Sequence, residues 1–63
     1  MTTEGATRTI INSLDGPSGK AIMYEVFKAG STEPQYEVEG AGKTQVFPSM
    51  GEAYVEAKRI AGN

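Results

Sequence analysis

The side chains that could do chemistry in this 63-residue chain are its eight carboxylates, because the chain contains no histidine and no cysteine. Nucleophile–base pairs of the Ser-His or Cys-His kind, and metal sites built from imidazole or thiolate, are therefore excluded. Glu25, Glu37 and Glu39 are spaced so that they can lie on one face of a sheet. Paired carboxylates act as acid and base, or hold a hard cation, in a concave site that separates their pKa values. A flat sheet of this size offers no such cleft, so we expect a protein that is not an enzyme and needs no cofactor or metal.

A second candidate motif is the sequence GAGKT at residues 40–44, which resembles the end of a phosphate-binding loop. The full pattern needs another glycine five residues before Gly42, where this chain has Glu37, and the loop must open a helix. Residues 45–48 are strand-like instead. We therefore expect a hairpin turn here and no small-molecule ligand.

Length and composition limit the class of protein. A chain of this length forms one domain with a modest core. Its net charge of −2 neither steers it onto a phosphate backbone nor makes it a strongly acidic mimic of one. No apolar run approaches the roughly 20 residues of a membrane span, and residues 1–6 lack the features of a signal peptide. We expect a single domain over 1–63, with 1–6 as a frayed terminus, in the cytoplasm and away from membranes.

The last stretch of the chain has the only unambiguous period and predicts a helix. Ser49 and Glu52 have the spacing of a capping box, so the helix begins there. Lys58 and Arg59 suit its last turn, and Gly62 can end it in the left-handed conformation. One stripe of this helix contains Met50, Ala53, Tyr54, Ala57, Ile60 and Ala61, and the opposite stripe contains Glu52, Val55, Glu56 and Arg59. The apolar stripe requires a surface that it can cover.

Strands in the preceding residues supply that surface. Residues 7–14, 20–28, 35–39 and 43–47 are rich in β-branched and aromatic residues or alternate between apolar and polar ones. Clusters of Gly, Pro, Asp and Ser separate them and predict turns. We therefore predict an α+β fold, in which an antiparallel β-meander of three to four strands carries one C-terminal amphipathic helix packed on one face.

The second strand has apolar side chains at both sets of alternate positions, so its pattern does not decide which face is buried. If Ile22, Tyr24 and Val26 face the helix, the core also contains Tyr36, Val38, Val46, Met50, Tyr54, Ala57 and Ile60. The uncovered face then carries Met23, Glu25, Phe27, Glu37, Glu39, Gln45 and Phe47. In the first strand either Ile10 with Leu14, or Ile11, faces inward.

The predicted uncovered face is typical of a partner surface, because apolar side chains lie on it among charges of one sign. The predicted partner-binding residues are Met23, Glu25, Phe27, Glu37 and Glu39. The carboxylates would supply complementarity and association rate, and the two apolar residues a desolvated contact. We expect a larger protein or nucleoprotein complex with a basic surface as the partner. The other ways to cover this face are a second copy of the chain, forming a homodimer, or the N-terminal segment.

The alternative function is a small nucleic-acid-binding module. Its stacking residues would be Tyr24, Phe27, Tyr36 and Phe47 on the sheet. Lys58 and Arg59 at the helix end would contact the phosphates. The other basic residues are scattered, and Glu25, Glu37 and Glu39 would repel a phosphate backbone where the aromatic residues lie.

The ending FPSMGEAYVEAKRIA at residues 47–61, after the strand YEVE at 36–39, resembles a group of very short bacterial and phage proteins in which a few strands lead into an S-x-x-E-A-x-x-x-A helix. Some phage proteins of this kind, including anti-CRISPR proteins, inhibit host machinery by binding a large effector and perform no chemistry. The resemblance implies a phage-encoded inhibitor that acts in the host cytoplasm. Such a protein would block a basic, nucleic-acid-binding surface of the effector.

Overall fold

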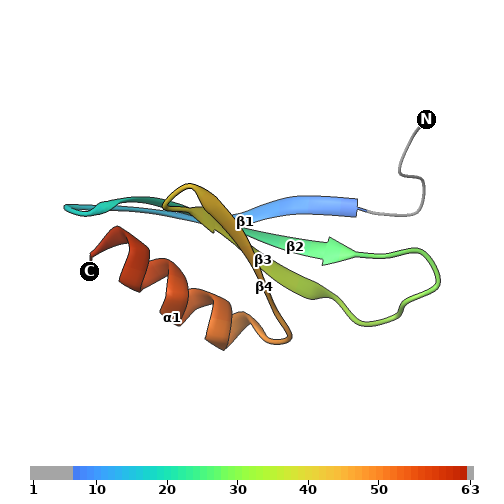
Figure 1. Ribbon diagram of the computed structural model, residues 1–63. Helices are drawn as coiled ribbons and strands as arrows, with labels where there is room; N and C mark the ends of the chain where they lie inside the picture. The colour runs from blue at the N-terminus through green and yellow to red at the C-terminus, as the bar shows by residue number, and fades with distance from the viewer. Residues whose placement is uncertain (1–6, 63) are drawn as a thin grey trace.

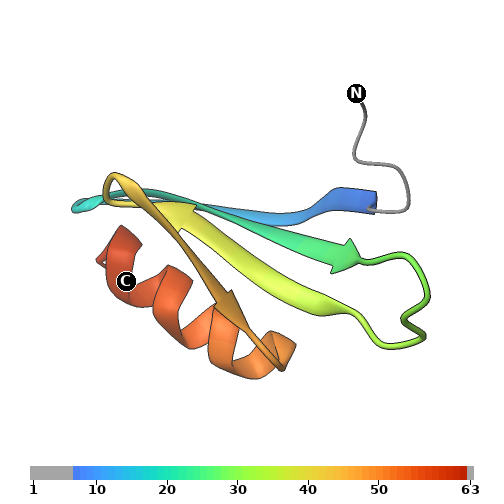
Figure 2. The same ribbon diagram turned by 45° about the vertical axis from the view of Figure 1, so that its right-hand side comes forward.

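The computed structural model describes residues 7–62 and has an α+β fold (Figure 1). Its elements are β1 Thr7–Gly16, β2 Gly19–Phe27, β3 Gln35–Gly40, β4 Lys43–Phe47 and α1 Met50–Ala61. The strands form one antiparallel sheet in chain order, and α1 lies against one of its two faces (Figures 1 and 2). The predicted meander with a C-terminal helix is confirmed. The expectation of a frayed terminus at 1–6 lies outside the described residues.

The two ends of α1 are capped as the sequence predicts. The Ser49 hydroxyl accepts a hydrogen bond from the backbone N–H of Glu52 at 3.3 Å. It also donates to the Glu52 carboxylate at 3.3 Å, which in a standard capping box would accept from the Ser49 N–H instead. At the other end Gly62 has φ 85°, and its N–H donates to the carbonyls of Lys58 and Arg59 at 2.9 and 3.2 Å. Local sequence therefore sets both boundaries of the helix.

The turn between β1 and β2 contacts the C-terminal end of α1. The N–H of Ser18 donates to the carbonyl of Ala61 at 3.0 Å. Carbonyls in the last turn of a helix have no donor within the helix, so this bond satisfies one of them. The first hairpin and the helix end are thereby held together, although they lie far apart in the sequence.

The GAGKT sequence forms the predicted hairpin turn. Gly40 pairs with Lys43, so that Ala41 and Gly42 are the two loop residues. Both have positive φ angles, 55° and 78°, which is the conformation of a type I′ turn. The strand register that continues from this turn places Val46 opposite Glu37.

The pattern of β2 left the buried face open, and the core lies on the face opposite to the one on which the predicted partner surface was based. Met23 is opposite Val38, whereas Tyr24 is opposite Glu37. Directly opposed residues point to the same side of a sheet. Met23 and Val38 are 1% and 0% exposed and lie beneath the helix. The helix-facing set of β2 therefore begins with Ala21, whose small side chain lets α1 approach the sheet.

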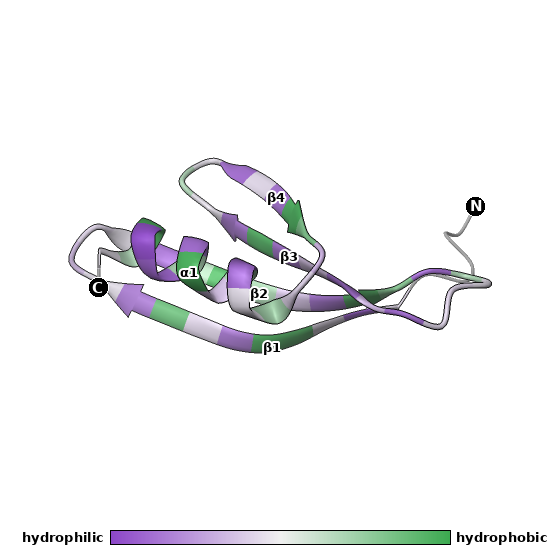
Figure 3. Cartoon of the chain, turned by 90° about the horizontal axis from the view of Figure 1, so that it is seen from below, coloured by the Kyte–Doolittle hydropathy of each residue, from purple (hydrophilic) through white to green (hydrophobic). Residues whose placement is uncertain are grey.

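Small residues dominate the contact between helix and sheet. The buried cluster consists of Ala21, Met23, Val38, Ala53, Ala57 and Ile60, with Leu14, Tyr36 and Phe47 packed against it. Three predicted core residues, Ile22, Tyr24 and Val46, lie on the opposite face of the sheet instead. Val26 is buried but shares that opposite face. In Figure 3 the helix lies between β1 and β3 in the half of the sheet near the β1–β2 turn, and the other half of β1 and β2 extends beyond it.

Two residues of the predicted apolar stripe of α1 are exposed. Met50 is 53% and Tyr54 is 42% exposed, whereas Ala53, Ala57 and Ala61 are fully buried. The buried stripe is therefore narrower than the sequence period indicates. The alanines bring the helix backbone close to the sheet, and Met23, Val38 and Ile60 fill the space that remains between the layers.

A β-bulge in β1 explains why its pattern was ambiguous. Ile10 pairs with Tyr24 but Asn12 pairs with Met23, so the register shifts at Ile11. Ile10 therefore points away from the helix, whereas Leu14 packs against the core. The bulge changes the alternation between Ile10 and Leu14, so each predicted alternative is right in part. Ile11 lines a groove on the helix side together with Met23 and Met50, and Leu14 faces the core without Ile10.

We expect Met23→Ala to lower the free energy of unfolding by about 2–4 kcal/mol, because it removes the largest buried side chain of the core. The matched variant Ile22→Ala, on the neighbouring residue and the uncovered face, should cost less than about 1 kcal/mol. Urea unfolding of both variants measures the difference. A larger loss for Ile22→Ala would contradict the observed assignment of the faces.

We expect Ala41→Asn to stabilise the protein by about 0.5–1 kcal/mol, because asparagine tolerates the left-handed conformation that strains alanine. Gly42→Ala is the control and should destabilise by about 1 kcal/mol, since it introduces the same strain at the next residue. Thermal and urea unfolding report both changes. Equal stability of all three proteins would rule out the type I′ turn.

Candidate protein-interaction surface

The sheet face opposite α1 is uncovered in the described part of the chain (Figure 2). We call it the open face and define it by the residues Arg8, Ile10, Ile22, Tyr24, Glu37, Glu39 and Val46, which the strand register places on one side. Ile10 is 61% and Val46 is 55% exposed. Ile22 and Tyr24 lie between them on the central strand and are partly buried. Apolar side chains therefore lie on β1, β2 and β4 of this face, and the carboxylates of Glu37 and Glu39 on β3 separate Val46 from the others.

A polar network crosses three strands on the open face. Arg8 Nε donates to Glu37 Oε1 at 3.0 Å, and the Arg8 guanidinium lies 3.6 Å from the centre of the Tyr24 ring. The Tyr24 hydroxyl donates to Glu39 Oε1 at 2.7 Å. This hydrogen bond raises the pKa of Tyr24, because an ionised phenolate would lose the bond and be repelled by the carboxylate. The network orients Arg8 and Tyr24 along the sheet before any partner arrives.

The structure divides the predicted partner-binding residues between the two faces. Met23 is 1% exposed in the core, so the prediction that it forms an exposed contact was wrong. Glu25 and Phe27 alternate with the residues of the open face and lie on the helix side of β2. Glu37 and Glu39 do lie on the open face. The predicted cluster of three carboxylates is therefore reduced to two.

Sequence reasoning missed Arg8, Ile10 and Val46 as members of this surface. The sequence did contain a signal for Val46. A two-residue turn after Gly40 places Val46 opposite Glu37, and the alternation of β3 had already predicted that Glu37 faces solvent. No comparable signal existed for Ile10. Its orientation depends on the bulge at Ile11 and on pairing with β2.

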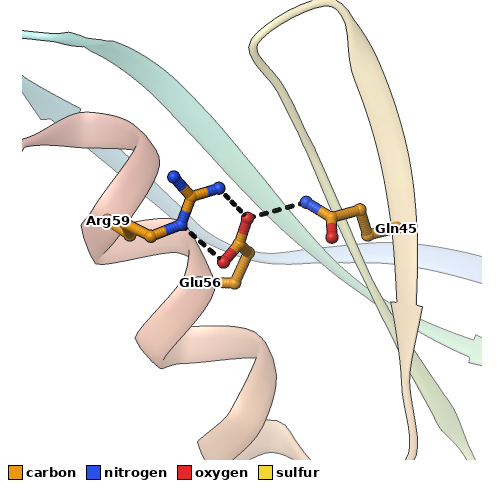
Figure 4. Close-up of polar contacts among 3 residues, drawn as sticks. All are labelled: Gln45, Glu56 and Arg59. Carbon is orange, nitrogen blue, oxygen red and sulfur yellow. Dashed lines mark hydrogen bonds and ion pairs between the residues drawn. The ribbon is translucent and has the colours of Figure 1, made fainter.

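A second polar cluster fastens the helix to β4 (Figure 4). Arg59 Nε donates to Glu56 Oε1 at 2.8 Å, and Arg59 Nη2 donates to Glu56 Oε2. Gln45 Nε2 on β4 donates to Glu56 Oε2 at 2.7 Å. These bonds, with that from Arg59 the stronger, lower the pKa of the Glu56 carboxyl to about 2. Glu56 was expected on the outward stripe, but its side chain is only 17% exposed.

The features proposed for nucleic-acid binding are not gathered on one surface. Arg59 is paired with Glu56, and Lys58 lies 5.7 Å from the ring centre of Tyr54. Tyr36 and Phe47 pack against the core on the helix side. The Tyr24 ring is on the open face, but Arg8 already stacks on it.

No protein-family model, curated protein or solved structure matches this chain. Within residues 7–62, no three acidic side chains are grouped closely enough to hold a metal ion. The single helix of that region is too short and too polar to cross a membrane. The chemistry of the surface is therefore the basis for a functional proposal.

The Glu56 cluster predicts a pH dependence of stability. Because the pKa of Glu56 is about 2 in the folded state and 4.5 as a free group, its interactions stabilise the fold above pH 4.5 and are lost as the pH falls towards 2. We expect Glu56→Gln to flatten the stability curve over this interval, measured by urea unfolding at a series of pH values. In an Arg59→Gln background the same substitution should have a smaller effect. Parallel curves for wild type and Glu56→Gln would contradict the ion pair.

Proposed function

We propose that this chain is a small protein-binding module that docks its open face on a larger protein and acts by occupying that protein's surface rather than by catalysis. The observation that carries the proposal is the exposure of Ile10 and Val46 at the two sides of a sheet face that also holds an oriented polar network. Monomeric proteins seldom leave such an apolar face uncovered without a partner for it.

The energetics of this face suit recognition. Complete burial of a fully exposed isoleucine or valine side chain contributes roughly 1.5–3 kcal/mol. Ile10 and Val46 are 61% and 55% exposed and Ile22 is already partly buried, so covering each of them supplies part of that contribution. Tyr24 adds a ring that is already held in place by Arg8 and Glu39. Side chains that are ordered before binding lose little entropy when the complex forms.

The partner surface is proposed to be basic. Glu39 is exposed and uses Oε1 for the Tyr24 hydroxyl, which leaves its other oxygen able to accept from a lysine or arginine of the partner. Glu37 lies on the same strand and forms an ion pair with Arg8. A basic surface of this kind often binds nucleic acid, so the chain would act as a competitor. Inhibition of a host effector by a phage-encoded protein is the narrower form of this proposal and rests on the resemblance of residues 47–61.

The test is an affinity capture from a lysate of the cells in which the protein acts, with nuclease present. Val46→Lys should abolish retention of the partner, because it places a charge in the apolar part of the open face. Val55→Lys is the matched control: it adds the same charge at a residue 68% exposed on the helix, away from the open face, and should retain the partner.

A second pair of variants tests the chemistry of the partner. Glu39→Lys should weaken binding to a basic surface by about tenfold or more, whereas Glu52→Lys, on the helix, should not. Retention of the partner by both Val46→Lys and Glu39→Lys would reject the open face as the binding surface. Retention that requires intact nucleic acid would favour the alternative function.

A further inference from the structure

The Arg8 guanidinium on the open face is only partly used by contacts within the chain. Its Nε atom donates to Glu37 Oε1 at 3.0 Å, and this is the one hydrogen bond that the side chain makes within residues 7–62. The remaining N–H donors of a guanidinium are on Nη1 and Nη2. The Arg8 side chain is 45% exposed, so a partner can reach these donors.

The same guanidinium is held in place before a partner arrives. It lies 3.6 Å from the centre of the Tyr24 ring on β2, and Glu37 on β3 holds it through Nε. A long side chain that is free in solution loses rotamer entropy when it binds. Arg8 is already ordered by contacts with two other strands, so its exposed Nη atoms are prepared for recognition.

A charge of the opposite sign lies at the other end of the Tyr24 ring. Glu39 is exposed, and its Oε1 atom accepts from the Tyr24 hydroxyl at 2.7 Å. Neither ion pair of residues 7–62 includes Glu39. The open face therefore presents a positive group and a negative group with one tyrosine ring between them.

We propose that the open face recognises a segment of its partner in which an acidic side chain lies beside a basic one, the acid bound by Arg8 and the base by Glu39. This inference rests on the proposed function and specifies which groups the basic partner surface presents. The Nη1 and Nη2 atoms form one edge of the guanidinium and match the two oxygens of a carboxylate. The base donates to the Glu39 oxygen that the Tyr24 hydroxyl leaves unused.

Charge complementarity favours an acid opposite Arg8. A segment with basic residues throughout would place like charges together at Arg8, which costs affinity and selects against such a partner. A neutral carbonyl group has one oxygen for this edge, whereas a carboxylate has two. Glu37 does not occupy the same edge, because its oxygen is bonded to Nε.

The position of Tyr24 limits how the two charges are spaced in the partner. Its ring lies against Arg8 and its hydroxyl bonds to Glu39, so the two charged groups are near neighbours on the surface. In an extended segment, residues i and i+2 point to the same side and lie about 7 Å apart. We therefore expect the acid and the base to be two residues apart in the partner's sequence.

Selection from a yeast-displayed library of random peptides tests this recognition without knowledge of the natural partner. Wild type should enrich peptides that carry an acid two residues from a base by about tenfold or more over the starting library. Arg8→Gln should lose the preference for acids and keep that for bases. Glu39→Gln should lose the preference for bases and keep that for acids.

Matched variants separate the role of Arg8 in binding from its role within the fold. Arg8→Lys keeps the positive charge but lacks the planar pair of donors, so it should bind a selected peptide about tenfold more weakly. Glu37→Gln keeps an oxygen that accepts from Arg8 Nε and should retain the preference for acids. In wild type, NMR should show that the peptide shifts the Nη–H resonances of Arg8, which requires no substitution.

Val46→Lys distinguishes failure of this inference from failure of the proposed function. Loss of the selected peptides by Val46→Lys places them on the open face. If those peptides show no preference for an acid, or if Arg8→Gln selects acids equally well, the role of Arg8 is overturned and the open face remains the binding surface. Retention of the peptides by Val46→Lys would overturn both proposals. Selection of no motif by wild type, or unshifted Arg8 resonances, would also overturn recognition of an acid by Arg8.

Discussion

The close approach of α1 to the sheet is the contact on which the rest of this structure depends. Ala53 and Ala57 are fully buried against β2 and β3, and Ala21 lies beneath them. A Cβ atom at Gly40 would lie 2.8 Å from the carbonyl oxygen of Lys20 and 3.0 Å from Cγ2 of Ile60. Alanine and glycine residues in both layers therefore let the backbone of α1 approach that of the sheet, and a few larger side chains fill the remaining space.

This close contact also explains why the other face of the sheet is open. Within residues 7–62 the one helix, of 12 residues, covers one face of the sheet. The helix selects the face with Ala21 and Met23, which leaves Ile22 and Tyr24 on the uncovered side. The apolar residues of the open face are thus a consequence of how the core is packed, and the proposed function makes use of them.

Several charged side chains that contribute to the net charge of the chain are paired with other side chains of the same chain. Arg59 and Gln45 hold the Glu56 carboxylate, and Arg8 and Tyr24 engage carboxylates of β3. The bond between Gln45 and Glu56 ties the helix to the sheet, the contacts of Arg8 and Tyr24 join neighbouring strands, and the pair of Arg59 and Glu56 lies within α1. Together they reduce the excess of negative charge at the surface. Recognition by the open face is accordingly expected to depend on apolar shape first and on charge second.

The order and boundaries of the elements were determined by local sequence, whereas the choice of faces was decided by tertiary packing. Ser49 and Gly62 define the helix ends through contacts within a few residues, and the turn at Ala41 and Gly42 sets the register of the last hairpin in the same way. The alternation of β2 is apolar on both sides, so no local preference could choose between Met23 and Tyr24. That choice depends on which side lets the alanines of α1 approach the sheet. The bulge at Ile11 likewise forms only when β1 pairs with β2, because pairing across the sheet, rather than the pattern of one strand, determines where an extra residue is accommodated.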